Sequence, residues 1–394
     1  MALQAGKGRV DGRHYLPSTP ETVLWGRLPG CGTPPVLAVE PESTITVDTV
    51  SHEGILEDQG RDPVAFFARY GVPPGEVLED ARSIAACVPH TFGVDGPHVV
   101  TGPVLVRGAE PGDVLRVETL SLHPRAGYGL VSARHGRGAL PGELPEGPPP
   151  EPDADARRWE GFRTTTTFCV VERRRGRLTG VLTFGGGRQA RFPLAPSMGV
   201  LAVGVDSPEP VHSTPPGRHG GNLDVRDLVA GSRLYLPVQV PGALFSVGDP
   251  HYAQGNGEVA LTALEAPLRA TFRLTVLRGP AARAAVGLLA EPFAETDTHW
   301  IPLGLHTDLD EAMRRAVRAA VRFLETRVGM DRASAYAYLS VAGDFAVSQV
   351  VDGVQGVHCL IRRSDFGPLP APQPPPVPQV PLLQRVPGRN ETRS

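Results

Sequence analysis

The densest group of chemically active side chains lies in one short segment, SVGDPHYAQGNGE, which runs from Ser246 to Glu258. Within it, Asp249 and His251 are two residues apart, so on a β-strand their side chains project from the same face. A carboxylate and an imidazole at this spacing suit a divalent metal such as zinc. The alternative is a polar hairpin loop whose side chains hydrogen-bond to its own backbone.

The same segment offers groups for proton transfer and for substrate binding. Glu258 stands where a following strand is expected to begin, so its carboxylate can point back into the site as a general base. The glycines at 248, 255 and 257 allow the backbone to approach a small ligand closely. We assign Glu258 to catalysis, and Gln254 and Gly255 to substrate binding.

A second candidate for catalysis is the segment RHGGNLDVRD, from Arg218 to Asp227. His219 can act as an acid, a base or a metal ligand. Asn222 can donate a hydrogen bond from its amide to a substrate carbonyl. The alternative is an Asx-turn that carries a surface histidine.

Two further residues complete a predicted metal site. Asp48 is an acid on the polar side of an apolar strand, and His98 precedes the strand VVTGP. Taken with Asp249 and His251, they give two carboxylates and two imidazoles, a set that suits zinc. We predict that three strand ends bring these four side chains together. The alternatives are a solvated or ion-paired Asp48 and a His98 that is satisfied at a strand edge.

Several familiar catalytic and binding patterns are missing from the sequence. It contains no GxSxG elbow, no P-loop and no HExxH motif. The 4 cysteines are scattered singly and form no CxxC pair, so neither a zinc knuckle nor a redox pair is indicated. At this size and spacing a disulfide framework is not expected either.

Length and composition restrict the class of protein. The chain has 394 residues, 41% of them hydrophobic, and a net charge of −3, which argues against a nucleic-acid or anionic-membrane partner. The N-terminus MALQAGKGRVDGRHYLP lacks the apolar run of a signal peptide. No stretch approaches the roughly 20 apolar residues of a membrane span. We therefore predict a soluble cytoplasmic protein.

The pattern of elements predicts a mostly β protein. Apolar segments with alternating polarity predict strand pairs within 34–50 and 98–122, and more strands between 162 and 205 and on both sides of the Ser246–Glu258 segment. Helices are predicted at 62–72, 308–329 and 331–343. In the longest helix the apolar stripe consists of Met313, Val317, Ala320, Val321 and Leu324.

We expect a β-sandwich-like fold with a smaller α+β section near the C-terminus. The predicted division is an N-terminal arm at 1–33, a β-rich catalytic core at 34–265, an α+β section at 266–366 and a proline-rich, disordered tail at 367–394. The core carries a variable insertion at about 124–195, and this includes an acidic, proline-rich loop at 137–157.

Taken in order, the motifs resemble those of the acetamidase/formamidase family. The resemblance begins at HYLPSTPETVLWG, continues through ITVDTVSHEG and HVVTGPVLVRGAEPGDVLRVETL, and covers most of residues 14–365. Its most specific part is 218–265, because few families join HGGN, PGALFSVGD and QGxGE in that order. Residues 124–195 match the family poorly, which leaves the acyl pocket and the substrate open.

The resemblance implies an enzyme that hydrolyses the C–N bond of small aliphatic amides, such as formamide or acetamide, to a carboxylate and ammonia. It also implies a mostly β fold, a bound metal and a homo-oligomer. Two alternatives stay open. One is hydrolysis of cyclic amides on the same centre, and the other is a β-rich binding protein that has lost the reaction.

Overall fold

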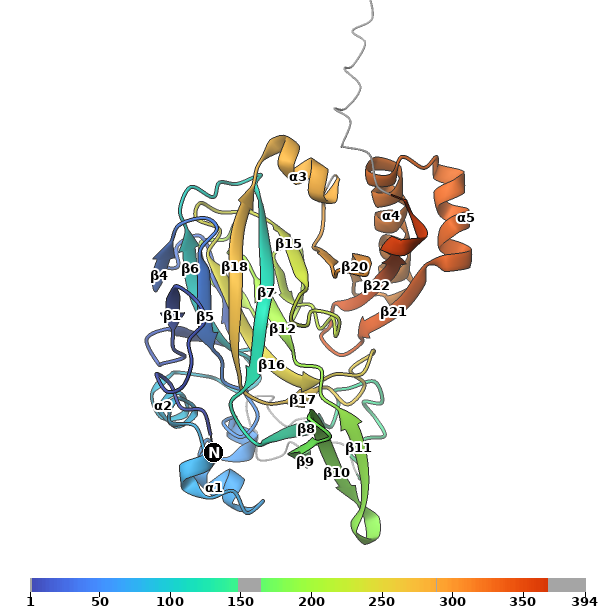
Figure 1. Cartoon of the computed structure of the whole chain (residues 1–394). Coiled ribbons are helices and arrows are strands. Elements are labelled where there is room, and N and C mark those ends of the chain that lie inside the picture. Colours follow the sequence, from blue (N-terminus) through green and yellow to red (C-terminus); the bar gives the residue numbers. More distant parts are fainter. Residues whose placement is uncertain (1, 148–163, 288, 368–394) are drawn as a thin grey trace, which may run out of the picture.

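Two large β-sheets, packed face to face, form the body of the molecule (Figure 1). The computed structural model describes residues 2–147, 164–287 and 289–367. Residues 148–157 of the predicted acidic loop and nearly all of the predicted tail lie outside these described residues. The expectation of a mostly β fold is confirmed.

The first sheet has nine strands, and only its outermost pair β1–β5 is parallel. In spatial order they are β1 (His14–Leu16), β5 (Thr44–Asp48), β18 (Leu268–Leu277), β7 (Val114–Pro124), β15 (Arg233–Pro237), β19 (Phe293–Glu295), β20 (His299–His306), β22 (Gln355–Arg362) and β21 (Asp344–Gln349). Strand β18 pairs with β5 and β7, so the sheet continues across residue 266. The division into domains stays a prediction.

The second sheet has eleven strands and carries the site described below. Its main path is β11 (Arg188–Pro193), β10 (Arg177–Phe184), β9 (Thr164–Arg174), β8 (Tyr128–Arg134), β17 (Leu264–Glu265), β16 (Phe245–Ala253), β12 (Ser197–Ala202) and β14 (Gly220–Asn222). Strand β6 (Val99–Val106) also pairs with β16, and β2 (Val23–Trp25) and β4 (Leu37–Val39) pair with β6. A small separate sheet joins β3 (Arg27–Leu28) to β13 (Val211–His212).

The core lies between the two sheets. Ile45 and Phe272 from the first sheet meet Phe245 and Val247 from the second in one buried cluster. The rings of Phe245 and Phe272 lie with their centroids 5.6 Å apart, edge to face. Burying each such side chain contributes about 1.5–3 kcal/mol. This packing holds β16, and the side chains that it carries, at a fixed position.

The helices are few and lie outside the sheets. They are α1 (Pro63–Ala68), α2 (Glu79–Cys87), α3 (Gly279–Val286), α4 (Leu309–Phe323), which continues through η5 (Leu324–Val328), and α5 (Arg332–Ala342). Shorter turns are η1 (Glu57–Gln59), η2 (Pro74–Glu76), η4 (Gly185–Gly187) and η6 (Arg363–Asp365). The side chains of Asp62, Asp308 and Asp331 cap α1, α4 and α5, as is typical of N-cap residues. No helix among the described residues is long and apolar enough to cross a membrane.

Some local expectations need correction. The hairpin-loop alternative for the polar segment is wrong as far as Ala253, because β16 continues to that residue with β12, β6 and β17 as backbone partners. The strand expected directly after Glu258 is absent, since β17 begins only at Leu264. Met313 is 38% exposed, and α4 buries Ala312 and Ala316 toward the sheet in its place. Helices α2 and α3 and strand β20 were not predicted from the sequence.

Candidate metal centre and active site

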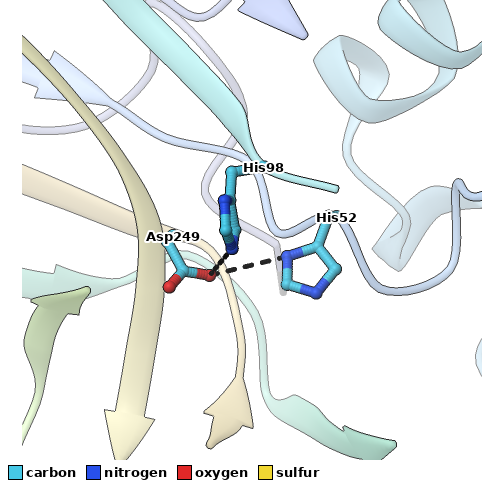
Figure 2. Close-up of side chains that lie close together, drawn as sticks. All are labelled: His52, His98 and Asp249. Carbon is cyan, nitrogen blue, oxygen red and sulfur yellow. Dashed lines mark ion pairs between the residues drawn. The ribbon is translucent and has the colours of Figure 1, made fainter. Parts of the chain in front are cut away.

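Two histidines and an aspartate meet where three segments of the chain converge. His52 lies in the loop after β5, His98 immediately precedes β6, and Asp249 lies in β16. His52 Nδ1 is 3.5 Å and His98 Nε2 is 3.9 Å from the same oxygen, Asp249 Oδ1. Figure 2 shows both rings directed at this oxygen. All three residues are at most 4% exposed.

The donor atoms of this group fit a divalent metal ion. His52 Nδ1 and Asp249 Oδ1 are buried and have no hydrogen-bond partner, which is costly unless a ligand satisfies them. His98 Nδ1 and Ser213 Oγ are 3.0 Å apart, and this hydrogen bond leaves Nε2 directed at Asp249. Burial lowers the pKa of His98 to about 4, so its imidazole is in the neutral, metal-binding form at pH 7.

A second row of groups holds His52 in place. Its Nε2 is 3.4 Å from Glu53 Oε1, and Arg134 Nη1 lies 2.9 Å from the same oxygen. Burial alone would lower the pKa of His52, but the carboxylates of Asp249 and Glu53 raise it to about 10. A carboxylate behind a metal-binding histidine is the usual way to orient the ring.

His251 lies on the other side of Asp249. Its Nε2 is 3.0 Å from Asp249 Oδ2 and 3.2 Å from Glu265 Oε1. Burial opposes protonation here, yet Glu265 and Asp249 hold the pKa of His251 well above its ordinary value. Gln254 orients the ring from behind, because its Oε1 is 3.2 Å from His251 Nδ1 and its Nε2 donates to the carbonyl of Asp224.

Three more buried carboxyl groups complete the site. Asp224, Glu258 and Asp352 offer oxygens that all lie within 4.8 Å of one another. Burial, followed by repulsion from Asp249, raises the pKa of Asp224 to about 7. Burial, followed by repulsion from Asp224, also raises the pKa values of Glu258 and Asp352 well above the ordinary range. These groups therefore keep their protons to a higher pH than ordinary carboxyl groups do.

The backbone is unusual at three of these acids. Asp224, Asp249 and Glu258 have φ values of 48°, 53° and 47°, in the left-handed region that non-glycine residues seldom adopt. Such conformations persist only where the surrounding structure enforces them, and they cluster at functional sites.

These side chains line a cavity of ≈ 140 Å³. Its polar wall includes Asn222, whose Oδ1 is buried and has no hydrogen-bond partner. Its apolar wall includes Leu56, Leu261 and Val351. The arrangement places a possible metal site, proton-holding carboxyls and a side-chain amide around one space that is large enough for a small molecule.

Of the residues proposed from the sequence, His98, Asn222, Asp249 and Glu258 line this cavity and His251 contacts Asp249 beside it, but Asp48 lies apart. Its carboxylate receives hydrogen bonds from Arg269 at 2.6 Å and from the hydroxyl of Tyr15 at 2.5 Å, and Arg125 lies 3.6 Å away. Among the described residues, none of the groups able to hold a metal includes Asp48. The ion-paired alternative describes this residue, and His52 takes its place beside His98 and Asp249.

Two other candidates also lie apart from the cavity. His219 is packed against Gly217 and Gly221, and burial lowers its pKa to about 4. Gly255 is exposed and contributes nothing to the lining. Gln254 contacts His251 rather than the cavity lining, so it acts as a positioning residue.

The sequence reasoning missed four site residues: His52, Asp224, Glu265 and Asp352. For His52 a signal was available, since it stands in the motif ITVDTVSHEG with Glu53 directly after it. Asp352 had no local signal, because it lies in the loop between β21 and β22, about 100 residues from Asp249.

Comparison with known proteins agrees with the resemblance seen in the motifs. Residues 203–361, which include Asp224, Asp249, His251 and Glu258, match the model of the Acetamidase/Formamidase family. This segment belongs to that family.

Several members of the acetamidase/formamidase family are similar to this chain. A Schizosaccharomyces pombe protein with a provisional formamidase name is 30% identical over 213 residues, 46% of this chain and 52% of its own length. The formamidase of Methylophilus methylotrophus is 29% identical over 198 residues, which are 41% of this chain and 47% of its own length. The acetamidase of Mycolicibacterium smegmatis is 28% identical over 198 residues, which are 41% of this chain and 49% of its own length. The matches thus span about half the length of these curated relatives.

Solved structures of the acetamidase/formamidase family share the fold over nearly the whole chain. The acetamidase of Bacillus halodurans superposes with a TM-score of 0.66 at 25% identity, over 89% of this chain and 98% of its own. The acetamidase of Yersinia enterocolitica gives a TM-score of 0.65 at 23% identity, over 93% and 96% of the two chains, which is evidence for the fold alone.

Proposed function

We propose that this protein hydrolyses small amides to a carboxylate and ammonia. The observation that carries the proposal is the meeting of His52, His98 and Asp249 with the proton-holding Glu258 at one cavity. The formamidases and acetamidases among its relatives support the same reaction class.

His52, His98 and Asp249 would hold the metal, and His251 stands beside them on Asp249. Two imidazoles and a carboxylate are a donor set typical of catalytic zinc sites, so zinc is the ion that we propose. A zinc ion in such a site supplies an acidified water and polarises a carbonyl group.

Glu258 is suited to move protons during the reaction. An amide nitrogen must be protonated before it departs, because the amide anion is a poor leaving group. The raised pKa of Glu258 makes its carboxyl group a weaker acid than usual, and its place on the cavity wall brings it near a bound substrate. Asn222, on the same wall, can donate its amide N–H to the substrate carbonyl.

Ammonia release tests the proposal. We expect protein purified without added metal to release ammonia from formamide, acetamide or propionamide, to lose activity with a chelator, and to regain it with zinc. Heat-denatured protein is the control for spontaneous hydrolysis. If folded, zinc-loaded protein turns over none of these amides, the proposed function is wrong. Location in the cytoplasm and assembly into a homo-oligomer stay sequence-based predictions.

A further inference from the structure

Arg137 lines the cavity but has no role in the proposed hydrolysis of formamide or acetamide. It lies just after β8, where its backbone N–H bonds to the carbonyl of Arg134 at 3.0 Å, and its side chain is exposed on the cavity. No carboxylate of the described residues pairs with its guanidinium. The other cavity arginine, Arg134, is satisfied by Glu53 and Asp58 at 2.9 and 2.7 Å.

The remaining charges on the cavity wall make it electrically asymmetric. Most of its acids, among them Asp224, Glu258 and Asp352, gather in the group around Asp249. One further acid, Asp95, is already paired with Arg27 at 2.7 Å. An anionic group of a ligand would be repelled by the carboxyl cluster and attracted to Arg137, so a ligand with one neutral and one anionic end has a preferred direction.

The cavity is also larger than the smallest amides require. Each molecule in liquid water takes up about 30 Å³, so a volume of ≈ 140 Å³ corresponds to about five waters. Acetamide fills only part of that space. The side chains of Leu56, Leu261 and Val351 offer an apolar wall along which a short methylene chain can lie.

We propose that the preferred substrates are short amides with a carboxylate at the end opposite the amide, and that Arg137 binds this carboxylate. The inference rests on the proposed amide hydrolysis and names its substrate class. Arg137 can grip a carboxylate through two parallel N–H···O bonds, and the neutral amide then faces Asn222, Glu258 and Asp249.

A pair of amides with the same carbon skeleton tests this assignment. Butyramide and succinamate differ only in that a terminal carboxylate replaces a methyl group. We expect the wild-type protein to have at least about tenfold higher kcat/KM for succinamate. A hydrogen bond to a charged group changes affinity by about 10- to 100-fold. In Arg137→Gln the succinamate-to-butyramide ratio of kcat/KM should therefore fall by that factor, chiefly because KM for succinamate rises.

Two further variants separate the charge from the fold. Arg137→Lys should keep part of the preference, because it retains the charge but not the planar fork. Arg191→Gln removes an exposed arginine on β11 that does not line the cavity, and the ratio should equal that of the wild type. An unchanged ratio in Arg137→Gln would overturn the assignment, as would a wild-type preference for butyramide.

The outcomes distinguish this inference from the proposed function. Release of ammonia from butyramide without a preference for succinamate refutes only the role of Arg137. If neither compound is hydrolysed but formamide or acetamide is, the substrate class proposed here is wrong and the proposed function stands. If formamide, acetamide and propionamide are not hydrolysed either, the proposed function fails, and calorimetry with succinate then tests Arg137 alone. Succinate binding that weakens at least about tenfold in Arg137→Gln supports the carboxylate site, and binding that is equal or absent in both proteins refutes it.

Discussion

Glu258 combines a strained backbone with a carboxyl group whose pKa is raised by burial and by Asp224. Its φ of 47° turns the chain directly after β16, so the side chain returns to the cavity that β16 lines. Its oxygen Oε1 lies 3.9 Å from His251 Nε2, which is too far for a hydrogen bond and leaves the carboxyl group available to a substrate.

Replacing Glu258 with glutamine tests whether it transfers protons. Glu258→Gln keeps the size and polarity of the side chain but cannot release or accept the proton, so kcat should fall by about 10²–10⁴-fold with fold and metal content unchanged. Steady-state kinetics with elemental analysis of the same samples measures both. A nearly unchanged kcat would indicate a structural role, and loss of metal together with activity would make Glu258 a ligand.

The candidate metal centre joins the loop after β5, the start of β6 and the middle of β16. Strand β16 pairs with β6, and this fixes His98 close to Asp249. No strand ladder holds His52, whose position depends instead on the contact between its Nε2 and Glu53. Glu53 is in turn held by Arg134, Gln59 and Ser132.

The structure predicts that His52 binds the metal. His52→Ala removes one of three donors, so the bound metal per chain should fall at least about tenfold. Loss of only a hydrogen-bonding partner behind a metal ligand already weakens metal binding by about 10- to 100-fold. His219→Ala is the control, because His219 is a partly buried histidine that lies away from the cavity. Elemental analysis after gel filtration is the measurement. Full metal content in folded His52→Ala would remove this residue from the ligand set.

Across the whole molecule, a buried network around Asp48 ties the N-terminal segment to the sheets. Arg269 of β18 bonds to Asp48 of β5 and to the backbone carbonyls of Lys7 and Arg9. Arg125 links the same carboxylate to Asp80 of α2, at 3.6 and 2.7 Å. Because the side chains of Asp48 and Arg125 are fully buried, neither charge can find water if its partner is removed.

Asp48→Asn should therefore destabilise the fold and leave the metal centre intact. Breaking a buried ion pair from one side costs about 3–5 kcal/mol in the free energy of unfolding, which urea denaturation measures. Glu118→Gln in the same sheet is the control: its partner Arg273 is 41% exposed, so the expected cost is below about 1 kcal/mol. Loss of metal from folded Asp48→Asn would restore the original assignment of Asp48 as a ligand.

Features that depend on residues close together in the sequence were predictable from the sequence alone. The aspartate caps of α1, α4 and α5 act on backbone groups two or three residues away, so the local sequence contains the whole interaction. The closeness of Asp249 and His251 follows in the same way from a spacing of two on one strand.

The choice between Asp48 and His52 depended on contacts between distant segments. Asp48 ends β5 and His52 follows in the next loop, and nothing nearby in the sequence shows that Arg269, 221 residues later, neutralises Asp48. The carboxyl cluster likewise joins Asp224, Glu258 and Asp352, which lie in three separate loops, after β14, between β16 and β17, and between β21 and β22. Charges act through space rather than along the chain, so the sequence supplied the chemical groups, and only the packing of the sheets decided which of them share a site.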